Sequence, residues 1–409
     1  MKKTLTILTI FFALAAAFFI TAACAERHNA YAADVDSSTD AEAVENIREE
    51  LESEVDKNLS GLINSELENY FAELDKGSLS VGNSFRELIE SVLSGENPLT
   101  PDTVLHAIAE AVTGSLSGIL LTMITIVVLS LLGGLGESLS SGFAKSGTSQ
   151  LIYWSVYGGI VVTLGFAING VITDAREAIN GIASLINYTF PVFVTLLTAL
   201  GGTGGVSVLA PVTLMINGAV SGIILSVVMP LFYATVVFTV VGNMSDNVRL
   251  GKLTKALKSV GGWILGITFG VITTVVAIQG IVGAGMDTIV LKSAKFALSS
   301  YIPILGGYLS EGFDLVLASC ILIKNAFGLS VFVILLSIVI APLVKILLLS
   351  LALKLVAGLI EPVSDSKISE LLYSTASNLN LLLSACAGMA FIVFIILLLV
   401  IGAFNAGVV

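Results

Sequence analysis

Charged and hydroxyl side chains that could act chemically gather in one stretch of the sequence, from Asp287 to Gly328. Four of them recur at spacings of four, three and four, which places them on one face of a helix: Thr288, Lys292, Lys295 and Ser299. The opposite face of the same helix is apolar. A face of this kind turns toward water or toward a partner protein, so it is a candidate conduit or interface.

The same stretch contains a break between two helical runs. Pro303 removes a backbone donor, and Gly306 and Gly307 supply two flexible residues. The second run carries Glu311 and Asp314 near its start, where the helix dipole favours acids. The sequence therefore predicts two half-helices that shape a conduit or a subunit contact. An amphipathic helix and turn lying along the membrane surface is the alternative.

Three lysines lie within apolar runs, where a charge is expected to be functional unless it reaches the interface from a helix end: Lys324, Lys345 and Lys354. Lys324, with its neighbour Asn325, closes the broken element and is a candidate site residue. Lys345 is expected to lie at a helix boundary. The acids after residue 110 are expected in loops or at the edges of spans, which argues against proton coupling.

Motifs for catalysis, phosphate binding or metal binding are weak. The glycine-rich segment 201–205 is not followed by Lys-Ser/Thr, and 364–367 matches the S-x-x-K pattern without supporting residues. The two histidines, His28 and His106, have no ligand cluster near them. The sequence therefore predicts that the protein is not an enzyme and has no cofactor and no metal site.

Composition indicates the class of protein. The 409 residues are 56% hydrophobic and 12% charged, with a mean hydropathy of +0.98, which is typical of a polytopic membrane protein. Charge divides the chain near residue 113, because 19 acids accompany 4 bases in 34–110 and 10 acids accompany 12 bases from 111 onward. We therefore predict an all-α fold with an acidic helical extracytoplasmic region at 33–113 and a multi-span membrane domain at 114–409.

Residues 1–32 have the layout of a secretory signal peptide, with Lys2 and Lys3 before an apolar run and small residues after it. Cleavage is expected after Ala32, with Ala25 as the second site and an uncleaved anchor as the alternative. In each case the acidic region begins outside the cytoplasm. Its surface could dock an extracytoplasmic partner or form a solvated cap. Its last helix is expected to start with Thr100 as N-cap and Pro101 as first residue.

The membrane domain contains nine apolar runs that could span a bilayer: 115–134, 151–172, 183–200, 207–227, 228–243, 262–284, 328–344, 345–360 and 381–403. The divisions at 227/228 and 344/345 are weak, and 328–360 could form one helix bent at Pro342, so seven to nine spans are expected. The basic loop 244–261 is predicted to be cytoplasmic. Counting onward then places 361–379 outside and the C-terminus inside.

Two further patterns concern helix packing. The units 151–245 and 262–360 each hold a span, an amphipathic link and two prolines 39 residues apart, which indicates a parallel internal repeat. Glycines spaced four apart, Gly218 with Gly222 and Gly266 with Gly270, allow helices to approach closely. Packing within the chain is the preferred interpretation of these pairs, and contact between subunits is the alternative.

The layout of the whole mature chain resembles the stage III sporulation protein AE family of endospore-forming bacteria. The blocks that carry the resemblance are FPVFVTLLTALGG at 190–202, VVMPL at 227–231 and LKSAKFALSSYIPILGGYLSEGFDLVLASCILIKNAFG at 291–328. The last block is the most specific, whereas the acidic segment is generic.

That resemblance implies a membrane subunit of the channel between mother cell and engulfed forespore, which supports forespore development and the late forespore sigma factor. It implies a place in the mother-cell membrane around the forespore. It also implies partnership with other stage III A proteins, one of which is the ATPase, and across the gap with the stage II protein Q complex. A homo-oligomer is compatible with this role, and no nucleic acid partner is expected. A self-sufficient secondary transporter of a small solute is the alternative, since broken helices and repeats also occur there.

Overall fold

The structure is a computed structural model that describes residues 70–71, 85–94, 98–143, 146–200, 203–244, 250–301 and 306–402. For the helical residues 137–143, 146–149, 203–209, 280–301 and 306–318 it describes the backbone alone. All regular structure within these ranges is helical, which confirms the predicted all-α fold. The signal peptide and most of the acidic region lie outside the described residues.

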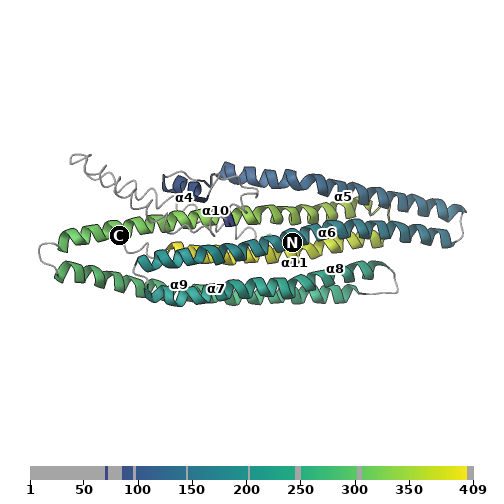
Figure 1. The fold of residues 1–409 in the computed structure, drawn as a ribbon. Coiled ribbons are helices and arrows are strands. Elements are labelled where there is room, and N and C mark those ends of the chain that lie inside the picture. Colours follow the sequence, from purple (N-terminus) through teal and green to yellow (C-terminus); the bar gives the residue numbers. More distant parts are fainter. Residues whose placement is uncertain are drawn as a thin grey trace.

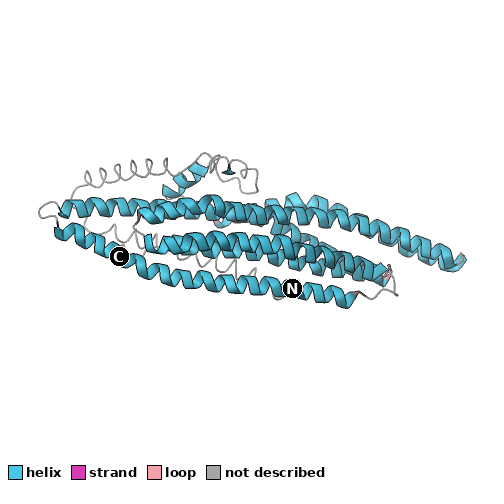
Figure 2. Cartoon of the chain, turned by 60° about the horizontal axis from the view of Figure 1, so that its bottom comes forward, coloured by secondary structure: helices cyan, strands magenta, loops and turns pink. Residues whose placement is uncertain are grey.

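The helices form one elongated bundle whose long members run roughly along a common axis (Figure 1). They are α4 (Phe85–Leu93), α5 (Pro101–Phe143), α6 (Ser146–Ala199), α7 (Thr203–Ile223), the π-helical turn η1 (Ile224–Val228), α8 (Met229–Met244), α9 (Gly251–Tyr301), α10 (Gly306–Ile360) and α11 (Ser366–Gly402). A view turned by 60° shows the same arrangement of long, roughly parallel helices (Figure 2).

The described residues contain six helices long and apolar enough to cross a membrane, and the nine predicted apolar runs fall on these six helices. The runs 151–172 and 183–200 both belong to α6, and 328–344 and 345–360 both belong to α10. Pro191 and Pro342 lie inside these helices and do not end them. Burial of the surrounding apolar face holds the helix together across the missing backbone donor.

The runs 207–227 and 228–243 are joined by η1. Pro230 cannot donate a hydrogen bond, and its ring crowds the carbonyl four residues earlier, at Ser226. The π turn contains that carbonyl, and the Met229 N–H donates to the Ile224 oxygen. The wider turn therefore absorbs the proline and lets α7, η1 and α8 continue as one rod.

Successive rods reverse direction, so their connections collect at two ends of the bundle (Figure 1). The turn after α10 lies at the same end as the connection between α8 and α9. There Lys367 Nζ lies 5.8 Å above the ring of Tyr153, and the Tyr153 hydroxyl lies 3.5 Å from the Asn243 carbonyl oxygen. The prediction that 361–379 lies across the membrane from 244–261 is therefore wrong. The prediction counted eight spans before 361–379, whereas five rods precede this turn. An odd number of crossings places the turn on the opposite side from an even number.

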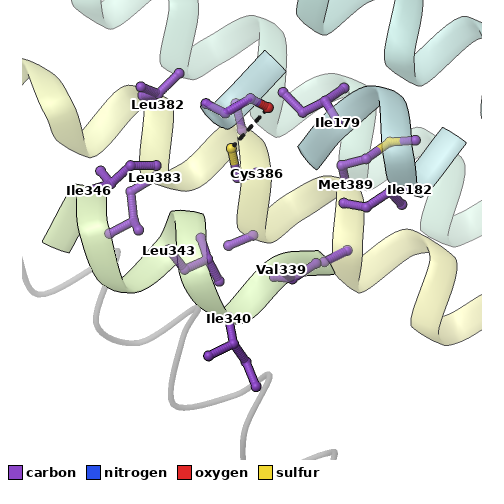
Figure 3. Packing of buried hydrophobic residues seen from close by; sticks show 14 of the residues in the cluster. Ile179, Ile182, Val339, Ile340, Leu343, Ile346, Leu382, Leu383, Cys386 and Met389 are labelled. Carbon is purple, nitrogen blue, oxygen red and sulfur yellow. Dashed lines mark hydrogen bonds between the residues drawn. The ribbon is translucent and has the colours of Figure 1, made fainter. Parts of the chain in front are cut away.

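The core is built by α6, α10 and α11, whose aliphatic side chains interlock (Figure 3). The residues labelled there are Ile179, Ile182, Val339, Ile340, Leu343, Ile346, Leu382, Leu383, Cys386 and Met389. The helix α11 is the most enclosed rod, with 67% of its apolar window buried against 17% for α5. An all-round apolar helix such as α11 is expected at the centre of a bundle.

The described end of the acidic region packs on the bundle. A chain of aromatic rings runs from Phe71 through Phe85 of α4 to Phe327 of α10, with centroid distances of 3.8 and 5.5 Å. The Tyr70 hydroxyl donates to the Gly181 carbonyl oxygen at 2.8 Å, and burial raises the pKa of this hydroxyl. The next helix, α5, begins as predicted, because the Thr103 N–H donates to the Thr100 hydroxyl at 3.2 Å.

The two units of the predicted repeat each correspond to a pair of long antiparallel rods that start at the same end. Their prolines are not equivalent, however. Pro191 lies inside α6, whereas Pro303 falls in 302–305, between α9 and α10, outside the described residues. The repeat stays a prediction.

Candidate functional site

The predicted broken element lies where two long helices meet. The helix α9 ends at Tyr301 and α10 begins at Gly306, so Gly306 and Gly307 are the first residues of α10. Each predicted half-helix is the end of a rod of 51 or 55 residues and not a separate short helix. Lys292, Lys295, Glu311 and Asp314 lie on helical backbone, and their side chains fall outside the described residues. Their role stays a prediction.

Lys324 is the most enclosed charged side chain of the described residues. It lies on α10 with 0% exposure, between the core residues Ile323 and Ala326. The Oδ1 atom of the neighbouring Asn325 is buried and has no hydrogen-bond partner among the described residues. Enclosing an ammonium group costs several kcal/mol unless the surroundings compensate, so we keep Lys324 as a candidate functional residue.

A second charged site links α6 and α10. The Lys345 ammonium forms an ion pair with the Asp174 carboxylate, and the two side chains are 37% and 32% exposed. Both residues lie in helix interiors, so the expectation that Lys345 marks a helix boundary is wrong. Asp174 directly follows the predicted apolar run 151–172, and it lies on continuous helix and not in a loop.

Asp174 was missed because the run 151–200 was divided at the polar cluster that contains it. Residues 173–180 contain neither glycine nor proline, and the apolar periodicity continues through them. A long helix with charges at its middle was therefore the better prediction.

Polar side chains also join the helices near the predicted basic loop 244–261, which we call the Lys-rich connection and whose lysines lie at the start of α9. Lys258 Nζ donates to the Ser377 hydroxyl at 2.7 Å, which ties α9 to α11. Asn378 Nδ2 donates to the Thr239 hydroxyl at 2.8 Å, which ties α11 to α8. Lys258 is thus part of a helix contact, because the predicted loop 244–261 is helical from Gly251. Such bonds orient helices where few water molecules compete.

The predicted glycine pairs do not mark close contacts among the described residues. A Cβ atom added to any of the four would meet nothing within 4 Å: Gly218, Gly222, Gly266 and Gly270. Close approach occurs at glycines that were not singled out. A Cβ on Gly388 would overlap the ring of Phe269, and one on Gly134 would overlap the Val363 carbonyl. Contact between subunits through the first four glycines stays a prediction.

These features define a multi-pass α-helical membrane protein. A family model described as stage III sporulation protein AE matches residues 83–403, so the chain belongs to this family and has a role in sporulation. The chain is 26% identical over 281 residues to stage III sporulation protein AE of Bacillus subtilis (strain 168), which covers 69% of the chain and 70% of that relative. No solved structure matches the chain.

Proposed function

We propose that this protein is a membrane subunit of a trans-envelope channel between mother cell and forespore. The observation that carries the proposal is the family match over 83–403, which includes all six apolar helices. On this proposal the protein lies in the mother-cell membrane around the forespore. It assembles with other stage III A proteins and, across the gap, with the stage II protein Q complex.

In this role the chain itself catalyses no reaction and holds no cofactor. Its task is to shape part of the path or to hold other subunits in place. The long rods and the aromatic contacts of Phe85 support a rigid scaffold. Forespore development and activity of the late forespore sigma factor would then depend on the chain indirectly, through an assembled channel.

Deletion of the gene in a spore-forming host tests this proposal. The expected result is engulfed forespores that fail to activate a reporter of the late sigma factor, together with loss of the other stage III A proteins from the purified membrane complex. Complementation with the intact chain should restore both readouts. Normal activation of the reporter in the deletion strain, or an unchanged complex, would contradict the proposal.

One observation favours the alternative, a self-sufficient secondary transporter. The Asp174–Lys345 pair places an acid in the interior of a long apolar helix, where carriers often keep coupling groups. The purified chain in vesicles with a pH gradient separates the two functions. Solute or proton movement that requires Asp174 would support a transporter, whereas tight vesicles together with loss of the channel on deletion would support a scaffold.

A further inference from the structure

The rods are much longer than a bilayer is thick. The 54 residues of α6 span about 80 Å, whereas a hydrocarbon core is about 30 Å thick. The lipid must therefore cover only part of the bundle. The exposed side chains show which part.

Three peripheral rods expose large apolar side chains over a limited length, which we call the lipid-facing belt. It runs from Leu116 to Leu135 on α5, from Leu151 to Phe166 on α6, and from Val227 to Met244 on η1 and α8. Contacts between Gly133 and Val156 and between Tyr157 and Val240 show that these three segments lie side by side. At 1.5 Å per residue these segments are about 22 to 29 Å long, close to one bilayer thickness.

Beyond the belt, the exposed face of α6 changes from apolar to polar. Within the belt it carries Val162 and Phe166, which are 59% and 77% exposed. The same face then continues with exposed Thr173, Arg176 and Glu177. It goes on through three more exposed polar residues, Asn180, Asn187 and Thr195. An arginine or acid facing lipid costs about 2.5–3.5 kcal/mol at the bilayer centre, so this part of α6 faces water.

The part of α5 before Leu116 also exposes polar side chains. Before Leu116 its exposed residues include Asp102, His106 and Glu110, although Leu105 is also exposed. The described end of the acidic region packs on the same part of the bundle, because Tyr70 contacts Gly181 and Tyr188. A segment predicted to be extracytoplasmic thus reaches α6 beyond the belt.

The interior explains why the sequence looks membrane-spanning there. Phe190 and Phe193 of α6 and Phe327 and Phe332 of α10 are at most 2% exposed. The runs 183–200 and 328–344 are therefore apolar because other helices cover them, as in any helical core. On the other side, α7 exposes Leu214 and Met215, and α9 exposes Val271 and Ile278, beyond the level of Thr173, so the polar surface belongs to the α5–α6 side of the bundle.

We infer that the bilayer ends near Thr173 on α6, and that 173–199 with 101–115 of α5 stand in the extracytoplasmic space. This outer half projects about 40 Å from the membrane along α6. The inference concerns the placement of the bundle and holds whether the chain is a channel subunit or a transporter.

Single cysteines placed in the full chain test the inference. The background carries Cys24→Ala, Cys320→Ala and Cys386→Ala, and each variant is checked for normal accumulation in the membrane. Cysteines replace Glu177 and Asn180 in the outer half, and Val162 and Phe166 in the belt as matched controls on the same face. An impermeant maleimide is added to intact vegetative cells that express each variant, because no engulfing membrane shields the outer face there.

The Glu177→Cys and Asn180→Cys chains should label at least about tenfold faster than the two belt variants, because a thiol reacts as its water-exposed thiolate. All four should label after denaturation. Labelling of Glu177→Cys and Asn180→Cys as slow as that of Phe166→Cys in intact cells would overturn the inference. Sporulation does not enter this readout, so a failed placement and a failed functional proposal give different results.

Discussion

At the scale of residues, the Asp174–Lys345 pair is the described charge contact between α6 and α10. Each side chain compensates the charge of the other inside its helix. Removal of one side chain therefore leaves the charge of the other uncompensated. Because both side chains are about one-third exposed, the pair contributes less than a fully buried pair would.

Charge reversal tests the pair directly. We expect Asp174→Lys and Lys345→Asp each to destabilise the chain by about 1–3 kcal/mol, and the double reversal to recover most of that loss. Thermal stability of the purified protein in detergent and its level in membranes measure the effect. Additive losses in the double variant would show that the two charges act independently.

Sequence reasoning located Lys324 as a site residue but could not see its enclosure, which depends on three-dimensional packing. It expected Lys345 at a helix end, because an apolar run of about 17 residues is long enough to be read as a separate span. Pairing with Asp174 joins residues 171 positions apart. No local periodicity in the sequence encodes a contact at that distance.

At the scale of elements, the sequence predicted the apolar runs and the helix start at Pro101. It did not predict that neighbouring runs join into single long helices. Pro191 was placed inside the run 183–200, which was separated from 151–172, and 328–360 was divided weakly at 344/345 or bent at Pro342. Inside a bundle the packing of the whole rod outweighs a local cost of about 3 kcal/mol for proline. Only between α9 and α10 do proline and two glycines coincide with a helix boundary.

That boundary gives a second prediction. Replacing Pro303 with alanine and Gly306 and Gly307 with leucine favours one continuous helix by about 5 kcal/mol in summed propensity. The chain must reverse between α9 and α10, so the triple variant should lose sporulation. Heat-resistant spore counts at matched protein levels measure this.

The control is Pro342→Ala, which lies inside α10 and should leave sporulation near normal. A triple variant that accumulates and sporulates like the parent would show that an interfacial turn of any conformation suffices there.

Close helix contact gives a third prediction. A leucine at Gly388 would overlap the Phe269 ring between α11 and α9, so Gly388→Leu should cost about 1–3 kcal/mol or more through overpacking. Gly358→Leu is the matched control, because a Cβ there meets nothing within 4 Å. Melting temperatures in detergent distinguish them. Equal melting temperatures would mean that α9 and α11 can separate at no cost.

At the scale of the whole molecule, six rods give a topology different from the one that nine runs imply. Three rods separate the acidic region from the Lys-rich connection, so these two segments still fall on opposite sides, as five spans would also place them. The turn after α10 changes side, because it follows five rods and not eight spans. The Lys367–Tyr153 contact places it beside the other connections of that end.

The sidedness of this turn is the last prediction. Single cysteines replace Ser259, Glu361 and Asp102 in the background without native cysteines, and all three positions are exposed. Asp102→Cys should label with an impermeant maleimide in intact cells, whereas Ser259→Cys and Glu361→Cys should label only after the membrane is permeabilised. The basic residues of the α8–α9 connection favour the cytoplasm, and the bundle holds Glu361 at the same end. Labelling of Glu361→Cys in intact cells, with Ser259→Cys protected, would restore the nine-run topology and show that α10 does not cross the membrane as one rod.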